Sequence, residues 1–450
     1  MRITHRTEAV FLFLGDTAVF YLSLFLVLLA RYGLPFDQRI IILHFLPFSI
    51  LFIFWILGFF IAGLYEQHTL LFQKRLPYRL LRSVLANTVM TALFFYFFPT
   101  FLITPRINLI LYLVVSSALL LVWRLYGFSF FNIQEKQTAL LVGSGVELGE
   151  LERELSGNPR YGVQLVSSVD ASRLSGEVNA DEMLRRASLG DVSLIIIDLQ
   201  SSSVETILPH LYNLLFSRVW FADLSKVYEE IFGRIPLSLV GHYWFLKNIP
   251  SVSSRFAYDF LKRLMDIGAA SALWLLALPL YLLVCIAVKL DDGGSLFVFQ
   301  DRVGQNNRII RTIKFRTMYR DDAGRTDLQK GNKITRVGAF LRRTRIDELP
   351  QLWNVLCGEM SLIGPRPELP ALVAVYEREV LYYRTRHLIK PGLSGWAQIY
   401  HENHPHHAAD VSETKVKLSY DLYYLKNRSL FLDLKIALKT IKILLSRSGV

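Results

Sequence analysis

Four long apolar runs in the first 130 residues constrain this chain more than any other feature. They cover residues 9–30, 40–64, 83–103 and 107–127. Each is about as long as the roughly 20 apolar residues that a helix needs to cross the hydrocarbon core of a bilayer. We therefore predict a membrane protein whose residues 1–130 form an α-helical bundle of four transmembrane helices.

Polar residues interrupt two of these runs. Asp16 lies in the first run and His44 in the second. Ionisable side chains within spanning helices usually face the bundle interior, so we expect both to point inward without a role in function. The start MRITHRTE enters the first run without a small-residue cleavage site, which predicts a retained anchor.

The basic residues predict how the bundle is oriented. The larger group lies before the first run and between the second and third: Arg2, Arg6, Lys74, Arg75, Arg79 and Arg82. The alternate loops contain fewer: Arg31, Arg39 and Arg106. Because positive charge is retained on the cytoplasmic side, both ends of the bundle are expected in the cytoplasm.

Composition narrows the kinds of partner. Hydrophobic residues make up 52% of the 450 residues, the mean hydropathy is +0.33 and the formal net charge is +12. These values favour an anionic membrane surface, phosphorylated substrates or both. The basic residues flank apolar runs instead of forming one solvated stripe, which argues against nucleic acid. The only cysteines, Cys285 and Cys357, argue against a disulfide framework and suit a cytosolic catalytic part.

Residues 137–250 show short β-like runs alternating with helical ones, which predicts a Rossmann-like α/β domain with parallel strands. TALLV precedes GSGVELG, and VSLIIID follows a charged helical stretch. Gly143 and Gly145 stand where a dinucleotide fold has its first two glycines, but Leu148 stands in place of the third. We therefore expect a structural or regulatory domain that binds no cofactor tightly.

A fifth apolar run, 264–288, lies between Lys262 and Arg263 on one side and Lys289 on the other. The positive flanks and the internal Pro279 predict a re-entrant helix that breaks at the proline and returns to the same side. The alternative is an ordinary fifth span with a kink, which would place everything after it outside the cytoplasm.

The C-terminal segment 431–447 predicts a further helix, with Lys435, Lys439 and Lys442 on one face. A basic amphipathic helix of this kind can lie in the membrane interface. The same pattern also fits a helix packed on its own domain, and the sequence leaves both open.

The segment RIDELPQL, residues 345–352, contains the candidate catalytic pair Asp347 and Glu348. Pro350 fits the first turn of a helix, so we expect a helix to begin near Asp347, where the helix dipole favours an anion. An acidic pair at such a position is usually only a cap.

Basic residues in neighbouring motifs argue for more than a cap. Those expected to bind substrate phosphates or nucleotide are Arg302, Lys314, Arg316, Arg342, Arg343, Arg345 and Arg366. Arginine matches phosphate oxygens bidentately, and several guanidiniums would offset the repulsion between an anionic nucleophile and a diphosphate.

With these motifs in place, residues 260–440 resemble the bacterial sugar transferases, the polyprenyl-phosphate hexose-1-phosphate transferases. The matching pieces are KRLMDI, DDGG, QDRVG, KFRTM, RIDELPQL, SLIGPRP, KPGLSGWAQI and YDLYYLKNRSLFLDL. The bundle and the α/β domain resemble the long members of the family by layout. The resemblance implies a mixed α/β catalytic domain over residues 255–450, in the bacterial inner (cytoplasmic) membrane and facing the cytoplasm. Leu278 departs from the small polar residue that the family often has before the re-entrant proline.

The resemblance also implies a two-step reaction. Asp347 would attack the β-phosphorus of a UDP-sugar and release UMP, and polyprenyl (undecaprenyl) phosphate would then take the sugar phosphate. Glu348 would help Asp347 hold Mg²⁺ or assist proton transfer, and Arg366 would contact nucleotide or phosphate. This reaction would be the first step of exopolysaccharide, capsule or O-antigen synthesis.

Two other functions are weighed against this one. A membrane-tethered nucleotide-sugar oxidoreductase or dehydratase would use the α/β domain and bind NAD tightly. A non-catalytic scaffold for polysaccharide assembly would not need Asp347 and Glu348. Histidines between His401 and His407 also suggest zinc, although their spacing matches no established ligand pattern. The sugar transferred, the pathway, any ligand of the α/β domain and a homo-oligomeric state are left open.

Overall fold

The structure is a computed structural model, and the parts of the chain that it describes are discontinuous. They are residues 6–33, 38–62, 64–65, 76–97, 106–126, 137–158, 161, 163–170, 192–199, 201, 204, 212, 219–249, 256–319, 334–400 and 410–446. The chain forms two compact units. One contains residues 1–140 and the other residues 195–450. The residues from 141 to 194 are divided between the two units.

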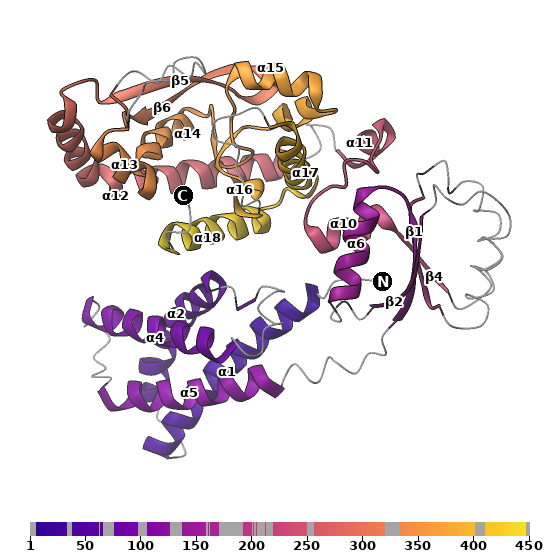
Figure 1. Ribbon diagram of the computed structural model, residues 1–450. Coiled ribbons are helices and arrows are strands. Elements are labelled where there is room, and N and C mark those ends of the chain that lie inside the picture. Colours follow the sequence, from indigo (N-terminus) through magenta and orange to yellow (C-terminus); the bar gives the residue numbers. More distant parts are fainter. Residues whose placement is uncertain are drawn as a thin grey trace. The chain divides into compact units, whose positions relative to one another are not determined.

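Four apolar helices form the N-terminal region (Figure 1). They are α1 (Arg6–Tyr32), α2 (Gln38–Ile61), α4 (Leu76–Phe97) and α5 (Arg106–Tyr126). Among the described residues of this region, Val10–Tyr32 and Leu43–Ile61 are long and apolar enough to cross a membrane, whereas Leu80–Tyr96 and Leu111–Arg124 are shorter apolar helices; Phe256–Asp291 is a third segment of sufficient length and hydropathy. The predicted apolar helical region is confirmed, and the chain is a membrane protein.

Aromatic side chains and one buried ion pair hold this helical region together. Phe20, Phe52 and Trp55 are buried and in ring contact. Asp16 is fully buried, and Arg124 donates to it with Nε at 3.1 Å. The Tyr65 hydroxyl also donates to Asp16, at 2.7 Å. The polar residue in the first run therefore faces inward and is paired, as a carboxylate at membrane depth must be.

The middle region alternates strands and helices. Its elements are β1 (Gln137–Gly143), α6 (Val146–Gly157), β2 (Val163–Asp170), β3 (Leu194–Ile197), β4 (Trp220–Asp223), α10 (Leu224–Phe232) and α11 (His242–Asn248). The strands form one sheet in the order β2-β1-β3-β4. The apolar runs of β1 and β3 are buried, which accounts for their continuous rather than alternating hydrophobicity.

The C-terminal region is a mixed α/β domain. Its helices are α12 (Phe256–Asp292), α13 (Arg336–Thr344), α14 (Leu352–Cys357), α15 (Pro370–Glu379), α16 (Trp396–Tyr400), α17 (Val411–Asn427) and α18 (Leu430–Ser446). Its 3₁₀ helices are η7 (Gln305–Asn307), η9 (Ile346–Gln351) and η10 (Tyr383–Leu388), and its strands are β5 (Phe297–Val303), β6 (Ile309–Phe315), β7 (Ser361–Ile363) and β8 (Gly392–Ser394). β5 and β6 form an antiparallel hairpin, and β7 pairs with β8 in parallel.

The main hydrophobic core of this domain also includes residues that precede α12 in the sequence. Ile363, Trp396 and Leu422 are buried there together with Ile235 and Trp244. Ile235 N–H also donates to the Ser419 carbonyl at 3.0 Å. The segment that contains α11 is therefore packed into the core of the C-terminal domain.

The helix α12 runs without interruption through Pro279 for 37 residues, which corresponds to about 55 Å, so the break that the sequence predicted at this proline is not present. Its buried positions follow one face on both sides of the proline: Asp266, Ala270, Ala277, Val284 and Val288. The first half packs on α14 and the second half on Phe315 and Leu341. The opposite face is apolar and exposed, with Leu275 at 59% and Leu282 at 69%.

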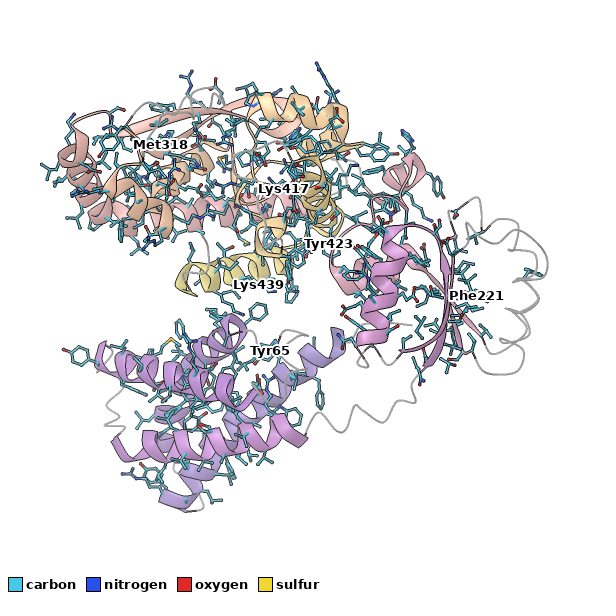
Figure 2. All side chains as sticks on the ribbon, in the orientation of Figure 1. Tyr65, Phe221, Met318, Lys417, Tyr423 and Lys439 are labelled. Carbon is cyan, nitrogen blue, oxygen red and sulfur yellow. The ribbon has the colours of Figure 1, made fainter. Side chains whose placement is uncertain are left out.

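The last helix, α18, turns its lysines toward its own domain. Lys435 lies over the ring of Trp396 at 5.3 Å and Lys439 over the ring of Tyr400 at 4.1 Å. Figure 2 labels Lys439 on this helix. Lys435 and Lys439 therefore face the domain, as expected for a helix packed on its own domain. The residues of α18 that face outward are apolar, including Phe431, which is 72% exposed.

Candidate active site

The acidic pair is placed by a short helix that is capped at both ends. Thr335 caps α13 by accepting from Gly338 N–H at 2.8 Å, and Asp291 of the DDGG motif accepts from Val337 N–H at 3.0 Å. The helix ends at Arg345, whose φ of 59° is left-handed and reverses the chain. η9 follows at once, so the helix start predicted near Asp347 is a 3₁₀ helix.

A close contact brings the KFRTM motif beside α13. A Cβ on Gly338 would lie 2.1 Å from the Thr317 carbonyl oxygen, so only glycine allows the helix to approach this strand end. Arg342 then donates through Nε to the Thr317 hydroxyl at 2.8 Å. Lys314, in the same motif and at the end of β6, pairs with Glu348.

Three cations surround Glu348. Arg366 Nη2 lies 2.5 Å from Oε1, Lys314 Nζ lies 3.1 Å from Oε1 and Arg345 Nη1 lies 3.9 Å from it. Arg366 also donates through Nη1 to Oε2 at 3.3 Å. Burial alone would raise the pKa of Glu348, but Arg366 and Lys314 outweigh it and hold that pKa well below the usual range. Glu348 is therefore a permanent anion that anchors cations.

Asp347 lies in a different environment. It is buried, and its Oδ1 has no hydrogen-bond partner in the described part of the chain. Burial and the neighbouring charge of Glu348 raise the pKa of Asp347 to about 6, although Lys314, Arg342 and Arg345 act to lower it. An ionised carboxylate with an unbonded oxygen is a better nucleophile than one held by donors, because no hydrogen bond has to break before attack.

The remaining predicted phosphate-binding residues, Arg302, Arg316 and Arg343, each have a different environment. Arg302 donates to Gln300 at 2.9 Å and to the Pro367 carbonyl at 3.4 Å, beside the turn that carries Arg366. Arg316 is buried against Gly294, where a Cβ would collide with its guanidinium. Arg343 is exposed on α13.

A buried ionic cluster, which the sequence did not single out, supports the turn that carries Arg366. Arg386 donates through Nη2 to the Arg366 carbonyl at 2.9 Å and lies 2.8 Å from Asp421. Lys417, labelled in Figure 2, pairs with Glu368 next to it. One signal was available, since Lys417 and Asp421 are charges four residues apart beside the apolar Leu418 and Leu422.

The acidic pair is also where a divalent cation would bind. Mg²⁺ commonly uses one or two carboxylates and completes its oxygen shell with substrate phosphates and water. The unbonded Oδ1 of Asp347, adjacent to Glu348, fits this mode. No cluster of three or more His, Cys, Asp or Glu side chains suited to a metal occurs among the described residues. The histidines from His401 to His407 lie outside the described residues.

Together these groups place a buried carboxylate, Asp347, beside a second carboxylate that is held by cations. Such an arrangement can attack an electrophilic phosphorus while Lys314, Arg345 and Arg366 stabilise the negative charge on the phosphate oxygens.

Comparison with known proteins identifies the family to which this domain belongs. Residues 257–447 match the bacterial sugar transferase family. The chain is 41% identical over 229 residues to a UDP-N-acetylgalactosamine-undecaprenyl-phosphate N-acetylgalactosaminephosphotransferase of Aeromonas hydrophila, covering 50% of this chain and 52% of the relative. It is 31% identical over 349 residues to a UDP-galactose-lipid carrier transferase of Erwinia amylovora, covering 70% of this chain and 69% of the relative.

A shorter relative matches nearly end to end. The chain is 35% identical over 235 residues to a UDP-glucose:undecaprenyl-phosphate glucose-1-phosphate transferase of Caulobacter vibrioides, covering 51% of this chain and 87% of the relative. The chain spans about half the length of the first two relatives it matches, 52% and 58%. The motif resemblance and these matches agree: the chain belongs to the bacterial sugar transferase family.

Proposed function

We propose that this protein transfers a hexose-1-phosphate from a UDP-sugar to a polyprenyl phosphate and releases UMP. The observation that carries the proposal is the division of roles between the adjacent carboxylates. Asp347 is buried with an unbonded oxygen, whereas Glu348 is held by Lys314 and Arg366. The names of the relatives, which include undecaprenyl-phosphate sugar phosphotransferases, support the substrate class.

The reaction follows from this geometry in two displacements. A carboxylate oxygen of Asp347 attacks the β-phosphorus, a new P–O bond forms, and the bond to the bridging oxygen breaks so that UMP leaves with that oxygen. A phosphate oxygen of the polyprenyl phosphate then attacks the same phosphorus and the bond to Asp347 breaks. Lys314, Arg345 and Arg366 bind the phosphate oxygens in both steps. The free carboxylate is restored.

We include Mg²⁺ in the proposal. The carboxylates of Asp347 and Glu348 are the groups that would hold it, together with the diphosphate. When bound, the ion neutralises charge on the diphosphate and so assists departure of UMP. Because Lys314 and Arg366 already engage the Glu348 oxygens, Asp347 is the more available ligand.

We further propose that α12 is re-entrant without a break: it enters the membrane as one continuous helix, and both of its ends lie on the cytoplasmic side of the inner membrane. Both halves of the helix pack on the same C-terminal domain. A straight crossing would require that domain to be on both sides of the bilayer. The exposed apolar face supplies the surface that would enter the lipid.

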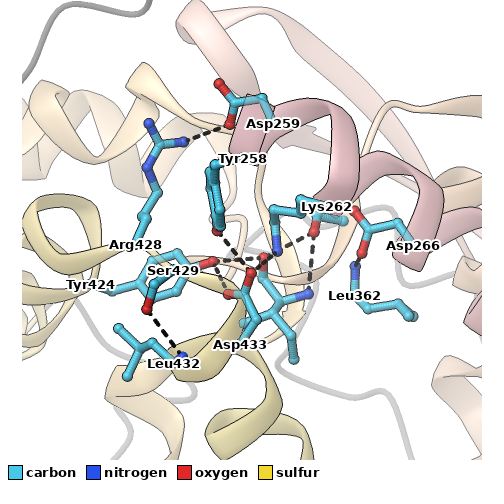
Figure 3. A network of polar contacts seen from close by, with 12 residues as sticks. Tyr258, Asp259, Lys262, Asp266, Leu362, Tyr424, Arg428, Ser429, Leu432 and Asp433 are labelled. Carbon is cyan, nitrogen blue, oxygen red and sulfur yellow. Dashed lines mark hydrogen bonds and ion pairs between the residues drawn. The ribbon is translucent and has the colours of Figure 1, made fainter. Parts of the chain in front are cut away.

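The start of α12 is attached to α17 and α18 by a polar network (Figure 3). In this view, Tyr258, Lys262 and Tyr424 converge on Asp433. Tyr258 donates to its Oδ2 at 2.8 Å and Lys262 lies 3.1 Å from the same oxygen, while Tyr424 donates to Oδ1 at 2.6 Å. These contacts support the proposal because they hold the first turns of α12 on the catalytic domain.

We also propose that the middle region is a Rossmann-like domain that binds no dinucleotide. The strand order β2-β1-β3-β4 places β1 beside β2 and β3, as such a fold requires. At the turn after β1, Glu147 accepts from Ser238 N–H at 3.1 Å and also from its hydroxyl. A carboxylate already lies where a pyrophosphate would need space, which disfavours the oxidoreductase alternative.

The direct test is release of UMP by the purified full chain with polyprenyl phosphate, Mg²⁺ and a panel of UDP-hexoses and UDP-N-acetylhexosamines. One member of the panel should support multiple turnovers that depend on the lipid phosphate. The proposal fails if no UDP-sugar yields UMP while the protein remains folded.

A further inference from the structure

A cavity of about 210 Å³ lies away from the acidic pair, at the first turns of α12. One face of α12 lines it with Asp259, Lys262, Arg263 and Asp266, spaced as successive helical turns require. Other parts of the wall come from β7, α17 and the segment after η10, which contributes Lys390. The cavity therefore has a wall of apolar side chains with charged groups set into it.

Most charged groups in the wall already have partners. Asp266 accepts from Leu362 N–H at 3.1 Å, and Asp259 lies 3.4 Å from Arg428. Lys262 pairs with Asp433. The close partners of these carboxylates are therefore other groups, and Asp266 and Asp259 act on Lys390 only from a greater distance.

Lys390 and Arg263 are the remaining cations of the wall. In the part of the chain that the structure describes, the Lys390 ammonium has no hydrogen-bond or ion-pair partner. Arg263 donates to the Val355 and Leu356 carbonyls at 2.6 and 2.7 Å, which caps α14 but supplies no counter-charge. The two groups also lie close together, because a Cβ on Gly358 would be 3.2 Å from Arg263 Nη2 and 3.6 Å from Lys390 Nζ.

Two adjacent, partly buried cations repel each other unless an anion lies between them. In keeping with this, burial and then Arg263 lower the pKa of Lys390, and the opposing effect of Asp266 and Asp259 does not cancel theirs. Glycine at position 358, with a φ of +84°, leaves the space between the cations open. The cavity is large enough for a phosphate group with its ester substituent or bound water.

We propose that this cavity is a phosphate-binding site, separate from the catalytic pair, in which Lys390 and Arg263 hold the anion. Two sources share this chemistry, the phosphodiester of an anionic phospholipid headgroup and free inorganic phosphate. The lipid source rests on the proposed seating of α12 in the membrane, since Phe256 and Phe260, in the first turns of the same helix, are 79% and 55% exposed. The free-phosphate source does not depend on it.

The test uses the full chain and four forms: wild type, Lys390→Gln, Lys390→Arg and the control Lys415→Gln. Lys415 is exposed on α17 and does not line the cavity, so its variant removes the same charge elsewhere. Arg263 is left intact because its loss would uncap α14. One arm measures binding of phosphatidylglycerol to protein in phosphatidylcholine nanodiscs by native mass spectrometry. The other arm measures thermal unfolding in lipid-free detergent with inorganic phosphate or with chloride at equal ionic strength.

Lys390→Gln should lower affinity at least about tenfold, because a charge-assisted hydrogen bond is lost, while Lys390→Arg and Lys415→Gln stay within about threefold of wild type. If the loss appears in the phosphatidylglycerol arm, the ligand is a headgroup. If it appears in the phosphate arm, the ligand is free phosphate. Equal binding by wild type and Lys390→Gln in both arms overturns the proposal. UMP release by the same wild-type preparation, measured in parallel, separates that failure from failure of the proposed transferase activity.

Discussion

Two neighbouring carboxylates in η9 have pKa values displaced in opposite directions, and this difference can be measured. Only ionised Asp347 can attack, so the rate of UMP release should fall about tenfold per unit as pH drops below about 6. Glu348 should not titrate in this range, because its pKa is held well below the usual value. A single-turnover measurement without lipid acceptor avoids titration of the acceptor phosphate. A rate that is constant from about pH 5 to pH 7 would contradict this assignment.

The pKa displacements of Asp347 and Glu348 also predict that their neutral variants change the free energy of unfolding in opposite directions. The folded pKa of Asp347 is raised from 3.8 to about 6, so its ionisation opposes folding, and this penalty appears as pH rises through that interval. Asp347→Asn should therefore raise the free energy of unfolding at pH 7 by up to about 3 kcal/mol, with the gain disappearing near pH 4.

Glu348→Gln is the matched comparison. It leaves Lys314 and Arg366 without their anion and should lower the free energy of unfolding at pH 7 by about 3 kcal/mol. Because the folded pKa of Glu348 is lowered, the contribution it makes at neutral pH is lost as pH falls below its ordinary value of 4.5. Chemical unfolding of both variants in one detergent measures the two effects. Effects of the same sign would show that the carboxylates do not occupy distinct environments.

The element that most needs support is the turn carrying Arg366, which has no regular structure of its own. Arg386→Lys keeps a positive charge near Asp421 but loses the planar donor group that reaches the Arg366 carbonyl. We expect kcat/KM for UMP release to fall about tenfold or more, measured well below the melting temperature of the variant.

Tyr383→Phe is the control for that variant. It removes only the hydroxyl that accepts from Arg386 Nη1 at 2.8 Å and leaves the bond to the Arg366 carbonyl in place. It should cost about 1 kcal/mol of stability and change kcat/KM less than threefold. If Arg386→Lys also retains kcat/KM within threefold, Arg386 stabilises the fold without positioning Arg366.

At the same scale, the sequence predicted some elements well and others poorly. The apolar helices of the N-terminal region follow from run length alone, and the basic motifs that converge on Glu348 follow from residue type. The direction of α18 could not be predicted, because Lys435 and Lys439 bind rings of Trp396 and Tyr400, which lie in another motif. Likewise, the cluster around Arg386 depends on charges that are distant in sequence and become neighbours only after folding.

For the whole molecule, the proposed orientation depends on whether the ends of α12 lie on one side of the membrane. Phe256→Cys and Ser295→Cys, each in a background with Cys285 and Cys357 replaced by serine, place single thiols at either end. Phe256 is 79% exposed, and Ser295 is also exposed. In intact spheroplasts, an impermeant maleimide should label neither thiol until the membrane is opened.

Arg31→Cys, at the exposed end of α1, is the control for that experiment. The distribution of basic residues predicts that it faces outward, so it should react in intact spheroplasts. Labelling of Phe256→Cys and Ser295→Cys on opposite sides would rule out the re-entrant helix. It would also remove the catalytic domain from the compartment that holds nucleotide-sugars.

The central claim is that Asp347 forms a covalent bond to the sugar phosphate, and intact-protein mass spectrometry tests it most directly. Wild-type protein mixed with its UDP-sugar and Mg²⁺, without lipid acceptor, should release about one equivalent of UMP and gain one sugar-phosphate mass, mapped by peptide analysis to Asp347. Asp347→Asn should show neither change, and polyprenyl phosphate should discharge the wild-type adduct. An unmodified wild-type protein that releases UMP only when the lipid is present, with the Asn variant turning over within tenfold of it, would contradict the account and favour direct attack by the lipid phosphate.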